Sequence, residues 1–125
     1  MKNLAQIRAR NALRTAQDSN KALRGKEGGE LIKKIPPIIM NHGFLAAAAY
    51  ACDDKNRGWR DAFDAIAEHL ADPEIGCIPP EAKTLEAMLS FLCSDKANSE
   101  TLKRVTAESM EWLNFARRFI KKDNG

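Results

Sequence analysis

Apolar residues recur every three or four positions along most of this chain, which is the spacing of one face of an α-helix. In the stretch 56–72 the large apolar residues fall on a single helix face: Trp59, Phe63, Ile66, Ala67 and Leu70. No stretch alternates apolar and polar residues as a half-buried strand does. The pattern therefore predicts an all-α fold, a compact bundle of five or six short helices.

Glycines and prolines divide this pattern into segments. We expect helices over residues 3–24, 30–41, about 44–52 and 56–72, a fifth helix near residue 85, and a long closing helix. Gly25, Gly28 and Gly29 are expected to end the first helix. Its predicted apolar side consists of Ala5, Ala9, Ala12, Leu13, Ala16 and Leu23. The fifth helix is expected to bury Leu85, Met88, Leu89 and Leu92, and the last Leu102, Val105, Trp112, Leu113, Ala116, Phe119 and Ile120.

The segment KKIPPIIMNHGFLAAAAYA, residues 33–51, is unusually apolar and is interrupted twice. Pro36 and Pro37 lack backbone N–H donors, so we expect them to start or kink a helix. Gly43 is expected to adopt a positive φ and to reverse the chain. The alanines that follow allow close helix packing, so the segment is predicted to form a buried helical hairpin.

The length of 125 residues predicts a single domain, residues 1–125. A hydrophobic content of 44% with 30% charged residues is typical of a globular protein. Three cysteines without a CxxC pair are expected to be small buried apolar groups in a reducing compartment. No stretch has the pattern of a signal peptide or a membrane span, so the sequence predicts a cytoplasmic protein.

The net charge of +3 is unevenly distributed. Residues 1–52 carry nine basic and three acidic side chains, whereas residues 53–111 carry seven basic and thirteen acidic ones. Residues 112–125 add four basic and one acidic side chain. Basic ends and an acidic middle favour a polyanion on one surface and a basic protein on another, although ordinary surface variation is the alternative.

The sequence offers no convincing catalytic, metal or cofactor site, so we expect no enzyme activity. His42 and His69 belong to no metal-binding motif, and no phosphate-binding glycine motif is present. Asp61, Asp64 and Glu68 share one helix face, which is able to bind a cation but is more typical of a solvated acidic surface.

Two groups of basic residues are more informative. The first helix carries an acid-free polar stripe of Asn3, Gln6, Arg10, Arg14, Gln17, Lys21 and Arg24. Residues spaced by one turn in this way suit a row of phosphates, although a solvated helix face is the alternative. A second cluster, Arg117, Arg118, Lys121 and Lys122, lies at a helix C-terminus, where the helix dipole also favours basic residues. Few exposed aromatic residues are evident, which argues against base stacking.

Three segments resemble the small α-helical subunit of type III-B CRISPR effector complexes, the Cmr complexes. The strongest is ELIKKIPPIIMNHGFLAAAAYA, in which basic residues precede an apolar-proline helix, a corner and an alanine-rich helix. RVTAESMEWLNFARRFIKK is similar to the family's closing helix, and AQIRARNAL to its first helix. In this chain His42 separates Asn41 from Gly43, where the family places Asn next to Gly.

The resemblance implies a non-catalytic subunit that acts in antiviral defence. Several copies would stack along the complex, beside the backbone subunits and the large Cas subunit, and contact guide RNA and target RNA. The residues that we expect to bind RNA are Arg10, Arg14, Lys21, Lys33, Lys34, Arg117 and Arg118. One alternative is a helical adaptor that binds only proteins; another is an independent nuclease that uses Asp61, Asp64 and Glu68.

Overall fold

The computed structural model describes residues 3–18, 25–53, 55 and 57–120, with no side chains described for residues 25–29. Within these residues the chain forms six α-helices and no strand. They are α1 (Leu4–Gln17), α2 (Gly25–His42), α3 (Phe44–Tyr50), α4 (Arg57–Ala71), α5 (Leu85–Leu92) and α6 (Ser99–Phe119). The predicted all-α bundle is confirmed.

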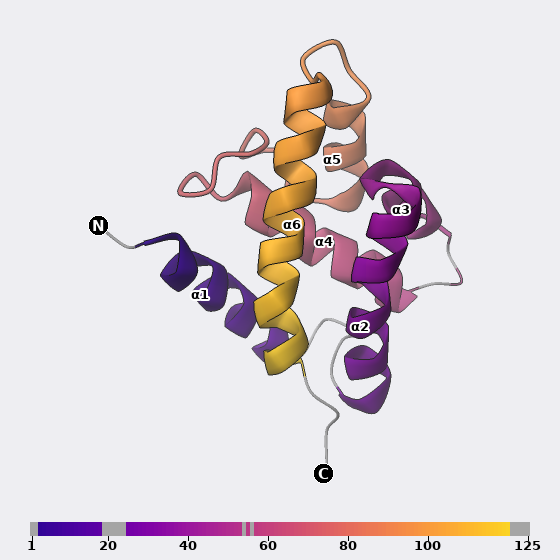
Figure 1. The fold of residues 1–125 in the computed structure, drawn as a ribbon, viewed down its shortest axis with the longest axis vertical. Helices are drawn as coiled ribbons and strands as arrows, with labels where there is room; N and C mark the ends of the chain where they lie inside the picture. Colours follow the sequence, from indigo (N-terminus) through magenta and orange to yellow (C-terminus); the bar gives the residue numbers. More distant parts are fainter. Residues whose placement is uncertain (1–2, 19–24, 54, 56, 121–125) are drawn as a thin grey trace.

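Helix α6 is the longest element, and the other helices are arranged around it (Figure 1). Helix α1 crosses its C-terminal half on one side, α2 and α3 lie on the opposite side, and α4 passes behind it. Helix α6 begins after Asn98, whose side chain accepts a hydrogen bond from the Thr101 N–H at 3.0 Å, while Thr101 Oγ1 accepts one from the Asn98 N–H. This capping box satisfies two backbone donors at the helix start.

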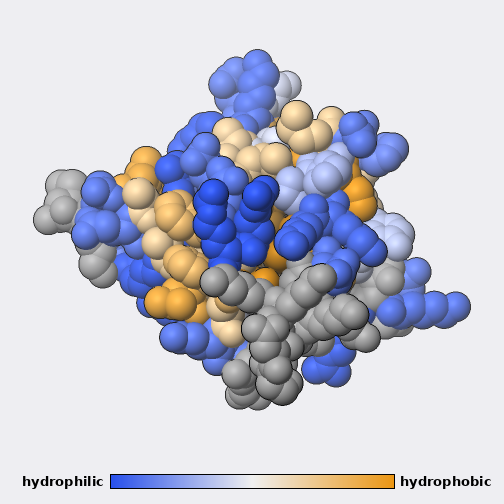
Figure 2. Space-filling view, turned by 60° about the horizontal axis from the view of Figure 1, so that its bottom comes forward, coloured by the Kyte–Doolittle hydropathy of each residue, from blue (hydrophilic) through white to orange (hydrophobic). Residues whose placement is uncertain are grey.

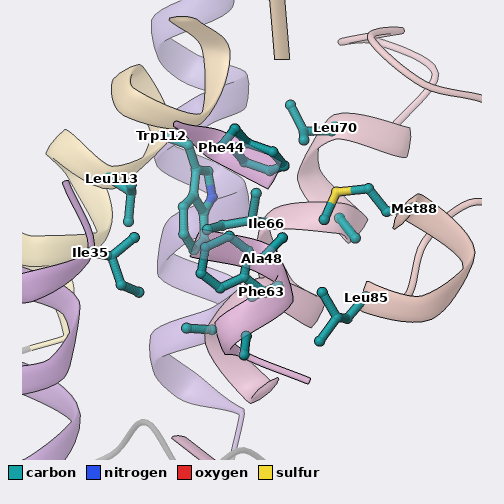
Figure 3. Packing of buried hydrophobic residues seen from close by; sticks show 14 of the residues in the cluster. Ile35, Phe44, Ala48, Phe63, Ile66, Leu70, Leu85, Met88, Trp112 and Leu113 are labelled. Carbon is teal, nitrogen blue, oxygen red and sulfur yellow. The ribbon is translucent and has the colours of Figure 1, made fainter. Parts of the chain in front are cut away.

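The core lies where α2, α3, α4 and α6 meet. Figure 3 shows Phe44, Phe63 and Trp112 close together between the helices, with Leu85 and Met88 of α5 nearby. All five are at most 3% exposed. The apolar faces predicted for the last three helices are confirmed except at Leu89 and Leu102, which are partly buried, and Phe119, which is 37% exposed.

Gly43 forms the corner between α2 and α3, as predicted. Its φ of 90° and ψ of 162° belong to a region that essentially only glycine adopts. The Gly43 N–H donates to the Ile39 carbonyl at 2.8 Å, and its own carbonyl accepts from Ala47. The hairpin buries Ile39 and Phe44, but the corner itself is exposed. Pro36 and Pro37 lie inside α2 instead of starting a helix.

The boundary between the first two helices differs from the prediction. Helix α1 ends at Gln17, capped by Asp18, instead of continuing to Arg24. Gly25, Gly28 and Gly29 lie within α2, so they do not separate the helices. Lys21, Leu23 and Arg24 lie outside the described residues.

The predicted apolar face of α1 is confirmed at Ala12, which is fully buried, and at Ala16, which packs against the core, but it is wrong at Ala5 and Leu13. The buried residues are Ile7, Asn11, Ala12 and Thr15. Ala5 is exposed and Leu13 is 44% exposed. The face that turns inward contains Ile7, which is a larger apolar side chain than the alanines, and Asn11, whose partners lie on α4 and in the loop after it.

The cysteines were also predicted incorrectly as buried groups. Cys52 and Cys93 are exposed, and only Cys77 is half-buried. Burial raises the pKa of the Cys77 thiol, so this sulfur stays protonated at neutral pH. Among the helices that the structure describes, none has the length and apolar character needed to span a membrane.

Candidate nucleic-acid interface

A polar cluster joins α1, α4 and α6 inside the molecule. Arg8 of α1 donates two hydrogen bonds of 2.7 Å to the carboxylate of Glu108 in α6, the first from Nε and the second from Nη2. His69 of α4, which is 2% exposed, lies 2.9 Å from the same carboxylate through Nε2. Burial would raise the pKa of Glu108, but the hydrogen bonds from Arg8 and His69 outweigh it and lower that pKa.

Asn11 extends this cluster from α1 to the loop after α4. Its Nδ2 donates to Asp72 at 3.0 Å and lies 2.9 Å from His69 Nδ1, while its Oδ1 accepts from Arg10 Nε. These contacts make Nδ1 the acceptor and Nε2–H the donor, which is the neutral imidazole. Burial lowers the pKa of His69, so the ring stays neutral. The cluster therefore positions α1.

Arg10 of the predicted stripe belongs to this internal structure. Its guanidinium lies 2.8 Å from Asp72 and 2.9 Å from Glu74, in the loop that follows α4. The stripe contains no acidic residue along α1, but in the folded chain Asp72 and Glu74 of the loop contact its residue Arg10. The positive charge of Arg10 is therefore paired with the carboxylates of this loop.

Asn3 and Gln6, the first two residues of the stripe, form hydrogen bonds within the chain. The Gln6 N–H donates to Asn3 Oδ1 at 2.8 Å, and the Asn3 N–H donates to Gln6 Oε1 at 3.0 Å. This capping box starts α1 and leaves Arg14 and Gln17 as the exposed end of the stripe. Arg14 has no ion-pair partner among the described residues.

The other predicted basic residues are exposed on two different helices. Lys33 and Lys34 lie in the middle of α2, and Arg117 and Arg118 lie in the last turn of α6. Arg118 donates a hydrogen bond of 3.2 Å to the Asn114 carbonyl, and none of the four has an ion-pair partner in the described part of the chain. The C-terminal ends of α1 and α6 and the N-terminal half of α2 lie toward the lower end of Figure 1. That these residues and Arg14 bind RNA stays a prediction.

The acidic residues of α4, Asp61, Asp64 and Glu68, do not converge on one point as the ligands of a metal site do. Asp64 Oδ1 accepts a hydrogen bond of 2.7 Å from the Leu85 N–H, at the first residue of α5. Asp61 lies 3.9 Å from Arg57, and Glu68 is exposed. No cluster of three or more His, Cys, Asp or Glu suited to a metal ion occurs among the described residues. Asp64 positions α5.

An aromatic groove on α2, α3 and α4 was missed by the sequence analysis. It has a volume of about 510 Å³ and is lined by Lys34, Ile38, His42, Ala46, Tyr50 and Trp59. Tyr50 is 53% exposed. Lys34, Ile38 and His42 recur every four residues and so share one helix face, but the apolar run around them predicts a buried hairpin and not a surface groove. We refer to this site as the Tyr50 groove.

An apolar strip on the surface was missed as well. It consists of Leu13 of α1, which is 44% exposed, and Phe119 of α6, which is 37% exposed and lines the same groove. Figure 2 shows apolar residues gathered along the left side of the molecule, where α1 lies, with hydrophilic residues across the centre. We call Leu13 and Phe119 the apolar strip.

The fold and these surfaces define a small all-α protein with exposed basic residues and an exposed apolar strip. A family model described as CRISPR-associated protein (Cas_Cmr5) matches residues 4–122. The chain belongs to this family, which is a small subunit of the type III-B Cmr complex. The match also covers the acidic middle of the chain, beyond the three segments that carry the resemblance. Searches of curated proteins and of solved structures each found no match.

Proposed function

We propose that this chain is a non-catalytic subunit that contacts the backbones of guide and target RNA through its exposed basic residues. The observation that carries the proposal is that five of the basic residues predicted to bind RNA are exposed and have no ion-pair partner in the described structure: Arg14, Lys33, Lys34, Arg117 and Arg118. Each has its charge available to a phosphate, whereas Arg8 and Arg10 are bound to carboxylates. Lys21 belongs to the same prediction and lies outside the described residues.

The apolar strip supports contact with other subunits, including further copies of this chain. Leu13 and Phe119 line one shallow groove with Ala9 and Gln17, so α1 and α6 form a continuous surface there. Burying the exposed part of these two side chains stabilises an interface by roughly 25 cal/mol for each Å² of apolar surface removed from water. The acidic loop and helices between residues 53 and 111 provide a second surface, which is complementary to basic neighbours.

The roles of the titratable groups support a subunit without chemistry of its own. Both ring nitrogens of His69 are engaged within the chain, Nδ1 by Asn11 and Nε2 by Glu108. Asp64 is held by the start of α5. In the proposed complex, RNA cleavage and signalling belong to other subunits.

A helical adaptor that binds only proteins is the second candidate, because the apolar strip by itself favours protein contacts. The test is a variant with Arg14, Lys33, Arg117 and Arg118 all replaced by alanine, assembled into the complex. We expect weaker binding of unrelated target sequences. The salt slope of binding should fall by roughly 0.7–0.9 for each phosphate that the variant no longer neutralises.

The matched control is the double variant Lys83→Ala/Lys96→Ala, which removes exposed lysines from the acidic middle. It should leave RNA binding and its salt slope unchanged. Unchanged binding by the four-residue variant, with the complex intact, would support the adaptor instead.

A further inference from the structure

The Tyr50 groove combines a rigid aromatic wall with a basic one. The aromatic wall is built as a column of rings that runs from the surface into the core. Tyr50 contacts Trp59 edge to face, with ring centroids 5.1 Å apart and an interplanar angle of 83°. Trp59 is stacked on Phe63 at 6.4 Å, and Phe63 contacts Phe44 at 5.7 Å. Tyr50 is therefore held in place while more than half of it stays exposed.

The opposite wall of the groove comes from one face of α2. Lys34, Ile38 and His42 follow one another by four residues, so they form a row about 12 Å long at 1.5 Å per residue. Lys34 is exposed and has no ion-pair partner among the described residues. The described residues that line the groove include no acid. The charge that this wall offers to a ligand is therefore positive, and it lies beside the apolar side chains of Ile38 and Ala46.

We propose that the Tyr50 groove binds one unpaired nucleotide of single-stranded RNA, with its base stacked on Tyr50 and its phosphate on Lys34. A nucleotide has both a flat π-face and a fixed negative charge, which are the two properties that these walls recognise. An apolar peptide would leave Lys34 uncompensated, and an acidic peptide would leave the ring uncovered. The held ring lowers the ordering cost of binding. This inference rests on the proposed function and adds a base-stacking site to the backbone contacts.

The first experiment uses the assembled complex and a single-stranded oligouridylate RNA that contains 4-thiouridine. Irradiation should give an adduct on the peptide that contains Tyr50. In a parallel binding measurement, Tyr50→Ala should weaken binding of the RNA about tenfold, because stacking of one base is worth about that factor. Tyr50→Phe keeps the ring and should bind within about twofold of the unaltered chain, which separates stacking from loss of the hydroxyl.

The second experiment repeats the measurement with an RNA of the same length whose nucleotides lack bases. Tyr50→Ala should then have no effect, because the sugar-phosphate chain alone does not stack. An equal loss with both RNAs would mean that Tyr50 acts on the fold, and the inference would be wrong. Circular dichroism of Tyr50→Ala checks the fold directly.

The remaining outcomes separate this inference from the proposed function. If Tyr50→Ala binds normally while the variant of Arg14, Lys33, Arg117 and Arg118 binds weakly, the groove is not a nucleotide site and the proposed function stands. If Tyr50→Ala disrupts assembly with other subunits and leaves RNA binding intact, the groove is a protein contact and the inference is wrong. If the unaltered complex binds no RNA at low salt, both proposals are wrong.

Discussion

Helices α1 and α4 both pack against α6, but different forces hold them. Helix α4 buries nine residues, of which His69 is the one polar member, and it reaches the ring cluster of the core. Helix α1 buries four, of which Asn11 and Thr15 are polar, and it is tied down by Arg8 and Glu108. We therefore expect apolar packing at α4 to supply most of the free energy of folding. The charged contacts at α1 should decide which face of that helix turns inward.

The largest effect is expected from removing a ring in the apolar region. Phe63→Ala should lower the free energy of unfolding by roughly 3–5 kcal/mol, because Phe63 is fully buried and a cavity would remain. Denaturant unfolding measures this loss. Phe119→Ala is the control, since Phe119 is 37% exposed, and it should cost far less. A Phe63→Ala protein of nearly normal stability would contradict the assignment of the core.

The next effect tests the charged contact of α1. Glu108→Ala should cost about 3 kcal/mol, because it leaves the partly buried guanidinium of Arg8 without its main partner and removes the acceptor of His69. Glu111→Ala is the matched control, because Glu111 lies 3.7 Å from Arg8 and its side chain is 54% exposed. We expect that control to cost less than about 1 kcal/mol. Equal losses in the two variants would mean that Glu108 has no special role.

A smaller loss is expected at the corner between α2 and α3. Gly43→Val should cost roughly 1–3 kcal/mol, because residues other than glycine are strained at its φ of 90°. A Cβ atom there would meet no atom within 4 Å, so the loss comes from the backbone and not from a clash. Gly43→Ala should therefore be nearly as costly as Gly43→Val. Thermal unfolding checks both, and unchanged stability would show that the corner relaxes.

The smallest effect is expected from pH. The lowered pKa of His69 means that the unfolded chain takes up a proton first as the pH falls below the ordinary value of 6.5. Stability should therefore decrease as the pH falls through and below about 6.5. His69 is faced there by Glu108 and Asp72, whose carboxylates stay charged in this range, and by Arg8.

His69→Gln should remove that decrease, as followed by the midpoint of thermal unfolding at each pH. The matched control is His42→Gln, which alters an exposed histidine and should keep the decrease. An identical pH profile for the unaltered chain and His69→Gln would mean that the ring titrates alike in both states.

The contrast between α4 and α1 also explains how far the sequence alone could predict the fold. The face of α4 was predicted correctly because Trp59, Phe63 and Leu70 are large and evenly spaced, so their burial dominates. The face of α1 was predicted correctly only in part, at Ala12 and Ala16, because its inward residue Asn11 is polar. Its partner His69 lies 58 residues further along the chain. Spacing along one helix carries no information about such a partner.

The candidate site was predicted to a similar extent. Lys33, Lys34, Arg117 and Arg118, which we expect to bind RNA, are exposed, as that role requires. The internal use of Arg10 could not be predicted, because Asp72 and Glu74 reach it only after the loop that follows α4 is folded. The exposure of Tyr50 could not be predicted either. Tyr50 is the last residue of an alanine-rich segment that the sequence predicts to be buried.

The paired prolines of α2 have a consequence for how this helix opens. Pro36 and Pro37 provide no N–H, so the carbonyls of Ile32 and Lys33 lack their usual partners four residues later. Two successive backbone hydrogen bonds of α2 are therefore missing at this point. We expect amide hydrogen exchange to divide α2 there, with the amides after Pro37 exchanging together with α3 and those before Pro36 exchanging at a rate of their own.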